Sequence, residues 1–518
     1  MTGDSVQIIV AMILYITIVI FIGLKYAKEA NESSDNYLIG GRSLGPWVTA
    51  MGAEASDMSG WLLMGLPGVA YWLGLSDAIW TAIGLFIGTY LNWLFVAKRI
   101  RNYSVVANNS ITIPDFFSNR FKEDKKILLG ISAVFIIIFF SVYASSCFVT
   151  VGKLFSSLFG LKYIHMMIAG ALFVIAYTFI GGFLAESASD FMQGIVMIIA
   201  LVAVLVAGVQ AAGGISQVVE NANQMPGFLE FFGIASPNLI NGVQQVEGGK
   251  PLFNEAGSYG LLSVISTLSW GLGYFGMPHV LLKFMAIRDA NELTLSRRIA
   301  TIWCLISLGA AVSIGIIGRV VFPDALLTQA QSESIFIMMS TNSFKPLFAG
   351  IVMAGILAAT ISSADSYLLI SAASFSKSIY QGILDEEAND YQVLRMTRIA
   401  LLVIAVIGMF IAMDENSVIF TVVSFAWAGF GATFGPIMLF SLFWKRVTWE
   451  GAIAGMVSGG CMVFIWKLLV RPLGGVLDIY ELLPSFLLSC IVIYVVSKIT
   501  KEPSKEIQEE FETVRNMG

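Results

Sequence analysis

A carboxylate and two serines interrupt a stretch of this chain that is otherwise apolar enough to cross a lipid bilayer. The stretch runs from Leu44 to about Leu73, and its polar centre is the run Ala55-Ser56-Asp57-Met58-Ser59-Gly60. An ionised carboxylate at the centre of a bilayer costs about 2.5–3.5 kcal/mol on insertion scales, and serine and glycine hold a regular helix poorly. Such a sequence persists in lipid only if its backbone and charge face a partner other than lipid. A bound cation is the first candidate for that partner.

Composition indicates that the whole chain is built for a membrane. Its 518 residues are 57% hydrophobic and 13% charged, whereas soluble proteins carry about 25% charged residues. We therefore predict an all-α integral membrane protein with about thirteen transmembrane helices. The first apolar window is long and lacks a basic leader, so we expect a retained helix and not a cleaved signal peptide. The predicted spans are residues 6–25, 44–74, 78–97, 127–158, 163–182, 189–212, 257–277, 299–322, 344–372, 396–414, 418–444, 451–470 and 481–500.

Basic residues mark one face of the membrane. They gather in alternate loops, whereas the long loop 213–256 carries four glutamates against one lysine. The positive-inside rule then predicts an N-terminus outside the cell and a C-terminus in the cytoplasm. We expect the charged tail from Lys501 to form a short frayed helix. The basic loops hold Lys25, Lys28, Arg42, Lys98, Arg99, Arg101, Arg120, Lys122, Lys125, Lys126, Lys283, Arg288, Arg297, Arg298, Lys377, Arg395, Lys445, Arg446, Lys498 and Lys501.

Two further apolar windows contain small or polar residues. Ser269–Pro278 ends its span with three glycines and a proline, which weaken a helix severely. Ala358–Ser366 places several hydroxyls in another span. The two interrupted spans that hold Asp57 and Pro278 are five spans apart, an odd offset that inverts the topology of the second half. Broken helices at matching positions of two halves indicate an inverted-repeat transporter with its site at the midplane.

Plainer explanations of these residues stay open at this stage. The glycines of Ser269–Pro278 could serve close helix packing, and the hydroxyls of Ser362 and Ser363 could bond to their own helix. Trp270 and Tyr274 could be a packing pair. Asp190 and Glu186 suit an interface or a helix cap better than transport. Glu54 could be a second intramembrane carboxylate or a solvated residue. Asp365 could help to form a gate or could cap a structural element.

Cysteines and histidines give no support for a transition-metal site. The four cysteines fall in apolar segments, so we expect buried free thiols and no disulfide. The two histidines lie far apart in the chain and bring no nearby cysteine. We also find no catalytic constellation, so we do not expect an enzyme or a cofactor. The residues concerned are Cys147, Cys304, Cys461, Cys490, His165 and His279.

A series of motifs follows in order along nearly the whole chain. They are Gly40-Gly41-Arg42-Ser43-Leu44-Gly45, Ala55-Ser56-Asp57-Met58-Ser59-Gly60-Trp61 with Gly65-Leu66-Pro67-Gly68, Gly181-Gly182-Phe183-Leu184-Ala185 to Asp190, Trp270-Gly271-Leu272-Gly273-Tyr274-Phe275-Gly276 with Pro278-His279, Ile356-Leu357-Ala358-Ala359, and Ala428-Gly429-Phe430-Gly431-Ala432. Through these motifs the chain resembles the sodium:solute symporter family, and within it the sodium/proline symporters.

The resemblance implies a leucine-transporter-like fold, with a five-plus-five inverted repeat and extra terminal helices. We expect a single membrane transport domain over residues 1–518. Its predicted parts are a first helix and cytoplasmic loop (1–43), a first inverted repeat (44–212), an extracellular loop (213–256), a second inverted repeat (257–444), two accessory helices (445–500) and a cytoplasmic tail (501–518).

The resemblance also implies roles for individual residues. It assigns sodium to the backbone carbonyls of Ala55, Met58 and Ala359 and to the hydroxyls of Ser362 and Ser363. It makes Asp57 important for sodium binding or coupling without requiring direct contact. It places around the substrate the residues Ser59, Gly60, Tyr143, Trp270, Tyr274 and Pro278.

The predicted function is sodium-coupled import of L-proline by alternating access, in a multi-pass protein of a bacterial plasma membrane. Its partners would be Na⁺, a small solute and the bilayer, with no nucleic acid. Some residues depart from the proline members: Ser363 replaces a usual threonine, Met277 a glutamine, Glu54 a glycine, Glu186 an apolar residue and Asp365 a serine. The alternative is therefore a sodium symporter for another amino acid, a carboxylate vitamin or an osmolyte. A channel would lack saturable, sodium-dependent accumulation, and a membrane sensor would need a signalling domain.

Overall fold

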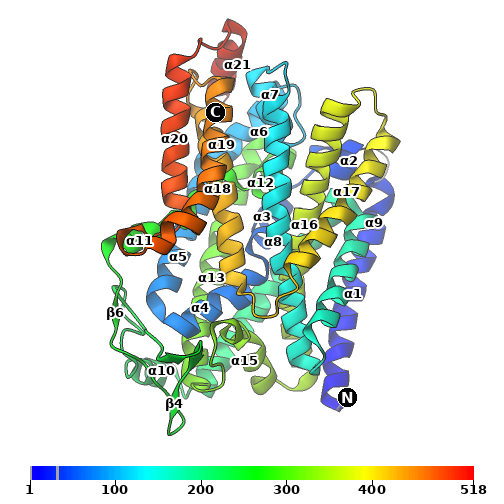
Figure 1. Ribbon diagram of the computed structural model, residues 1–518. Helices are drawn as coiled ribbons and strands as arrows, with labels where there is room; N and C mark the ends of the chain where they lie inside the picture. Colours follow the sequence, from blue (N-terminus) through cyan, green and yellow to red (C-terminus); the bar gives the residue numbers. More distant parts are fainter. Residues whose placement is uncertain (1–2, 31–33, 518) are drawn as a thin grey trace.

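The protein is almost entirely helical (Figure 1). The computed structural model describes residues 3–30 and 34–517. In that part of the chain, ten helices are long and apolar enough to cross a membrane by length and composition. The helices run side by side, and the two chain ends lie at opposite ends of the molecule (Figure 1). The all-α membrane architecture is thus confirmed.

Most predicted spans correspond to long helices. Three helices continue through a π-helical segment: α5 into α6 through Asn92–Val96, α16 into Ser374–Leu384, and α19 into Trp466–Val470. The spans predicted at 163–182 and 189–212 form one helical course, α9, whose backbone departs from helical geometry at Gly182 (φ 58°, ψ −170°). The long helices are α1 (Gly3–Ala30), α5 (Leu75–Leu91), α6 (Ala97–Val106), α8 (Ile127–Phe159), α9 (Tyr163–Ala211), α13 (Leu293–Val321), α16 (Pro346–Ala373), α17 (Asp390–Ile411), α18 (Ile419–Phe443), α19 (Trp449–Ile465) and α20 (Leu482–Ile499).

Two helical courses are broken, as the sequence predicts. The first consists of α3 (Pro46–Gly60), a π-helical turn and α4 (Leu66–Leu73), and its backbone leaves the helix at Ser59 (φ 49°, ψ −169°). The second consists of α11 (Leu261–Leu268), a 3₁₀ segment over Ser269–Gly276 and α12 (Pro278–Ala286). The prediction that the second break ends its span is wrong, because proline is well tolerated at a first helical position and a new helix begins there. The count of thirteen spans stays a prediction.

Close backbone contact between α5 and the second broken course explains part of the glycine content. A Cβ added to Gly271 would lie 2.2 Å from the backbone oxygen of Gly84. A Cβ added to Gly88 would lie 2.3 Å from the backbone oxygen of Gly271. Helix α5 therefore packs directly on the 3₁₀ segment, and the packing explanation of Gly271 holds. Of the four free cysteines, Cys147 and Cys304 are buried as predicted. The predicted burial is wrong for Cys461, which is exposed, and for Cys490, which is only partly buried.

Short elements cover both ends of the bundle. The end near the N-terminus carries the strands and α10 and α15, and the other end carries α7 and α21 (Figure 1). Helix α21 is docked and not frayed, because Ile507, Phe511 and Val514 are buried. The short elements are α2 (Ser34–Ile39), α7 (Ile113–Phe121), α10 (Ile215–Ala222), β1 (Gly233–Ile234), β2 (Leu239–Ile240), β3 (Val243–Gln244), β4 (Val246–Glu247), β5 (Lys250–Pro251), β6 (Gly257–Ser258), α14 (Gln329–Ser332), α15 (Ile335–Ser343), α21 (Lys505–Asn516) and the 3₁₀ turns Gly40–Arg42, Ala290–Glu292, Arg471–Leu473 and Gly475–Leu477. The strands pair antiparallel as β1–β6, β2–β3 and β4–β5.

Candidate functional site

Helix α16 lies against the broken end of α3 and bonds to its backbone. The Ser362 hydroxyl donates to the carbonyl of Ala55 at 2.9 Å, and it lies 3.1 Å from the carbonyl of Ala359 on its own helix. One turn further along α16, the Tyr367 hydroxyl donates to the carbonyl of Ser56 at 3.1 Å. Ala55 and Ser362, which the resemblance assigns to one site although they are 307 positions apart, thus meet in space.

The residue that follows Ser362 on α16 has a buried hydroxyl without a partner. The Oγ of Ser363 is buried and has no hydrogen-bond partner among the described residues. A buried polar group without a partner costs about 1–3 kcal/mol, so a ligand that accepts its lone pairs would remove that cost. Carbonyl and hydroxyl oxygens are the ligands that hard cations take. The donor set of Ala55, Ala359, Ser362 and Ser363 therefore fits a sodium ion.

Asp57 lies in the same break but points to a different partner. One carboxylate oxygen of Asp57 is 3.1 Å from Nε2 of His279 on α12, and both side chains are buried. The carbonyl of Asp57 accepts a hydrogen bond of 3.3 Å from the Tyr143 hydroxyl on α8. Asp57 thus links the broken course of the first half to that of the second half. This geometry suits a coupling role better than direct ligation of an ion on α16.

Glu54, one turn before the break, is an intramembrane carboxylate and not a solvated one. It is 2% exposed and accepts hydrogen bonds from the Thr89 hydroxyl at 3.1 Å and the Trp93 indole at 3.2 Å. Both donors stand at the junction of α5 with its π-helical segment. These hydrogen bonds offset part of the burial cost of the carboxylate and tie α3 to α5.

Aromatic rings gather around the 3₁₀ segment of the second course. The Trp270 ring lies 5.6 Å from that of Trp61 and stacks at 5.0 Å on Tyr480. The Tyr274 ring meets Trp427 edge-on at 5.0 Å. The Trp427 indole donates to the Trp270 carbonyl at 2.8 Å. Trp270 and Tyr274 thus belong to one aromatic cluster that includes the first break, which goes beyond a local packing pair.

The other predicted substrate residues are buried at the breaks. A Cβ on Gly60 would lie 2.4 Å from the Thr150 hydroxyl, so the position has room only for glycine. The Ser59 hydroxyl accepts from the backbone N–H of Trp61 at 3.2 Å. Pro278 begins α12. Tyr143 is buried on α8 and stacks at 4.3 Å on Tyr367.

A polar cavity reaches this aromatic cluster from the end of the molecule that carries the strands. It has a volume of about 430 Å³, and its wall includes Trp270, Tyr480, Asp77, Arg471 and Ile234 of β1. Of the six predicted substrate residues, only Trp270 lines this cavity. The other five do not line it, so the cavity touches the predicted substrate region at Trp270 and does not contain it.

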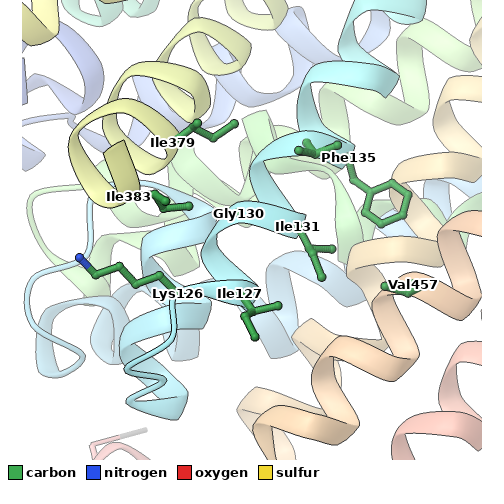
Figure 2. A pocket seen from close by; sticks show the side chains of 9 residues that line it. Lys126, Ile127, Gly130, Ile131, Phe135, Ile379, Ile383 and Val457 are labelled. Carbon is green, nitrogen blue, oxygen red and sulfur yellow. The ribbon is translucent and has the colours of Figure 1, made fainter. Parts of the chain in front are cut away.

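A second cavity has a different character. It has a volume of about 520 Å³ and lies between α8, the π-helical segment after α16 and α19 (Figure 2). Its walls are apolar, with Ile127, Phe135 and Ile383 among them and Lys126 at one edge (Figure 2). None of the predicted site residues lines it. It is a hydrophobic groove between helices and plays no part in the candidate site.

The acidic residues of α9 occupy a position that the sequence does not reveal. Glu186 and Asp190 are fully buried, and both bind the ammonium group of Lys283 on α12. The expectation of a helix cap for Asp190 is wrong, because Asp190 lies inside α9, two turns beyond Gly182. The placement of Lys283 in a basic loop is also wrong, because the side chain is 1% exposed within a helix. Asp365 is likewise buried in the interior of α16 and does not cap it.

Sequence reasoning missed three residues that bridge the site: His279, Lys283 and Tyr367. The sequence does carry a signal for the first two. Pro278 can occupy the first position of a helix, and the mostly apolar residues after it can continue that helix. Tyr367 carries no local signal, because its partner is the backbone of a distant helix. Its role follows only from the packing of α16 on α3.

Comparison with known proteins places this geometry in a family. The profile of the sodium:solute symporter family matches residues 37–459. This chain belongs to the sodium:solute symporter family. The sodium/proline symporter of Staphylococcus aureus (strain USA300 / TCH1516) is 40% identical over 517 residues, which are 99% of this chain and 96% of that protein. The sodium/proline symporter 2 of Staphylococcus saprophyticus is 39% identical, over 99% of this chain and 97% of that protein.

Solved structures support the fold of this family member. A substrate-bound, outward-open Na⁺-coupled sialic acid symporter superposes with a TM-score of 0.76 at 16% identity, over 96% of this chain and 99% of that one. A nucleobase-cation-symport-1 family transporter in a closed conformation gives a TM-score of 0.52 at 13% identity, over 92% and 98% of the two chains. The leucine-transporter-like fold expected from the motifs is confirmed, and the protein is a multi-pass transporter of the plasma membrane.

Proposed function

We propose that this protein imports L-proline together with sodium by alternating access. One observation carries the sodium part: the Ser362 hydroxyl of α16 binds the Ala55 carbonyl of α3, and the following residue, Ser363, has a buried hydroxyl without a partner among the described residues. The symport of proline is supported by the names of relatives about 40% identical over nearly the full chain. Family membership makes the protein a transporter and not an enzyme.

In the proposed mechanism, sodium binds between α3 and α16. Its ligands are the carbonyls of Ala55, Met58 and Ala359 and the hydroxyls of Ser362 and Ser363. To bind the ion, the Ser362 hydroxyl turns its proton away from the Ala55 carbonyl, and both oxygens then face the ion. The ion orders the break, and Asp57 transmits that order to α12 through His279.

The substrate binds next to the ordered break. The carboxylate of proline docks on the backbone amides of the segment from Ser59 to Gly60, where the helix is interrupted. The ring packs on Trp270 and Tyr274, since a small apolar ring needs an aromatic wall and few polar groups. Pro278 and Tyr143 complete the set of residues around the bound proline. We further propose that the N-terminus lies outside, so that the cavity at Trp270 opens outward.

The energetics are sufficient with one ion. One positive charge that crosses 100 mV releases about 2.3 kcal/mol, and a tenfold sodium gradient adds about 1.4 kcal/mol. Together they sustain roughly 500-fold accumulation of a neutral solute. Coupling to a single sodium would therefore support strong uptake.

A competition experiment tests the choice of substrate. Uptake of labelled proline is measured in proteoliposomes with an inward sodium gradient and an excess of unlabelled amino acids, carboxylate vitamins or osmolytes. We expect unlabelled proline to abolish uptake and the others to compete weakly. Met277, which is buried directly before Pro278, is the residue that favours a different substrate, because it replaces a glutamine of the proline members. Failure of unlabelled proline to compete, with strong competition by another solute, would reject proline in favour of that solute.

A further inference from the structure

The ammonium group of Lys283 sits in a cage of oxygen atoms inside the membrane-spanning part of the protein. Its Nζ lies 2.9 Å from Oε1 of Glu186, 3.0 Å from the hydroxyl of Ser187 and 3.1 Å from Oδ2 of Asp190. The ring of Phe183 covers it at 4.6 Å. Carboxylate and hydroxyl oxygens are also the ligands that proteins offer to hard metal cations. The oxygen atoms around Lys283 therefore have the chemistry of a cation-binding site, and the cation that they bind is the ammonium group of Lys283.

The acids of this cage outnumber its lysine. Glu186 and Asp190 against Lys283 leave a formal charge of −1, and no oxygen of the pair is exposed to solvent. The buried carboxylate of Asp365 on α16 interacts electrostatically with all three residues and adds a further formal negative charge beside the cage. Oε2 of Glu186 and Oδ1 of Asp190 have no hydrogen-bond partner among the described residues. A buried charge left without a counter-charge destabilises a protein by about 3–5 kcal/mol. The cage therefore needs a positive charge, and without the ammonium it would take up a metal cation or a proton.

The cage is joined to the candidate sodium site through α16. The Ser366 hydroxyl donates to Oε1 of Glu186 at 2.6 Å. Ser366 is one helical turn from Ser362, which contacts Ala55, and one turn rises about 5.4 Å. Helix α3 also passes the cage, because a Cβ on Gly52 would lie 3.5 Å from Nζ of Lys283. The two cation positions thus share α3 and α16.

We propose that Lys283 is a tethered cation that permanently fills a second cation site next to the sodium site. Its ammonium supplies the positive charge that a free ion would otherwise supply at Glu186 and Asp190. It also pins α12, the second half of a broken helix, to α9 and α16. This inference rests on the proposed sodium-coupled function. Its consequence is that removal of the lysine charge creates a site for one more sodium ion.

Sodium counting on the purified transporter tests the proposal. The number of radioactive sodium ions bound per protein at saturation is measured by equilibrium dialysis for the wild type, Lys283→Met, Lys283→Arg and the double variant Lys283→Met with Glu186→Gln. Lys283→Met changes the formal charge of the cage from −1 to −2, and the double variant restores −1. We expect Lys283→Met to bind about one sodium ion more than the wild type, and the arginine and double variants to match the wild type.

A second buried lysine provides the matched control. Lys153 on α8 binds Glu333 at 2.8 Å and the Ser417 carbonyl at 2.7 Å, and neither partner lies on α16. Lys153→Met should leave the sodium count unchanged, because a single carboxylate stands there and both its oxygens already accept backbone N–H bonds, from Ile419 at 3.0 Å and Phe420 at 2.9 Å. If Lys283→Met does not accumulate in the membrane, the neutral Lys283→Gln takes its place with the same expectation.

The outcomes separate this proposal from the function on which it rests. A folded neutral variant that binds as many sodium ions as the wild type overturns the tethered cation. An extra ion in Lys153→Met also overturns it, since the effect would then not be specific to the cage. Absence of any sodium binding or sodium-driven proline uptake in the wild type would instead reject the proposed function.

Discussion

Substitution of Ser363 by alanine is the sharpest perturbation of the candidate sodium site. The Ser363 hydroxyl is buried and has no hydrogen-bond partner among the described residues, so its loss breaks no protein contact. A hydrogen bond or ligand contact to a charged group contributes about 1.5–3 kcal/mol. At 1.4 kcal/mol per factor of ten, Ser363→Ala should weaken sodium affinity by about ten- to hundred-fold.

Two assays measure this effect. The first is the sodium dependence of proline uptake at low proline concentration. The second is the melting temperature of the purified protein with and without sodium, since an ion that binds only the folded state raises stability by mass action. In sodium-free buffer, we expect the melting temperature of Ser363→Ala to equal or exceed that of the wild type. Addition of sodium should raise the melting temperature of Ser363→Ala less than that of the wild type. Ser363→Thr keeps a hydroxyl and should retain most of the affinity.

Ser371 provides the control, because it lies on the same helix, is equally buried and also has no hydrogen-bond partner in the part of the chain that the structure describes. Ser371→Ala should leave sodium affinity unchanged. The reasoning is refuted if Ser363→Ala keeps a sodium affinity within about twofold of the wild type. It is also refuted if Ser371→Ala weakens sodium affinity as much as Ser363→Ala does.

Three further substitutions probe the breaks. Gly271→Ala should abolish folding or uptake, because its Cβ would lie 2.2 Å from a backbone oxygen. Gly309→Ala should be tolerated, because an added Cβ would meet no described atom within 4 Å outside the backbone of its own helix. Membrane expression and melting temperature decide this, and a stable Gly271→Ala protein would contradict it. Asp57→Asn should sharply raise the sodium concentration needed for half-maximal uptake, and an unchanged value would remove its coupling role. Ser59→Gly should raise the melting temperature, because a non-glycine residue at φ 49° costs about 1–3 kcal/mol, whereas Ser59→Ala should not; equal melting temperatures would count against this strain.

The broken helices could be predicted because their causes are local. Serine and glycine around Asp57, and glycines before Pro278, weaken a helix wherever it lies. The apolar windows likewise follow from bilayer thickness, which sets the length of a span. The helix that starts at Pro278 was missed because its lysine resembled a loop charge, and only the fold supplies the buried carboxylates of α9 that neutralise it.

Contacts between distant residues could not be predicted. Glu54 is stabilised by donors 35 and 39 residues away, so its sequence neighbours do not indicate whether it is solvated. The sodium candidates Ala55 and Ser362 were grouped only because the chain resembles a known family. No spacing rule connects residues 307 positions apart, whereas the packing of α16 on α3 does.

Sodium-driven accumulation of proline in proteoliposomes tests the central claim most directly. Vesicles that contain only the purified protein are diluted into buffer with labelled proline and either sodium or choline outside, with a potassium diffusion potential negative inside. We predict concentrative, saturable uptake with external sodium, and only equilibration when sodium is equal on both sides and the potential is absent. Equal uptake in sodium and choline, or uptake that never exceeds the external concentration under a full gradient, would contradict sodium-coupled proline symport.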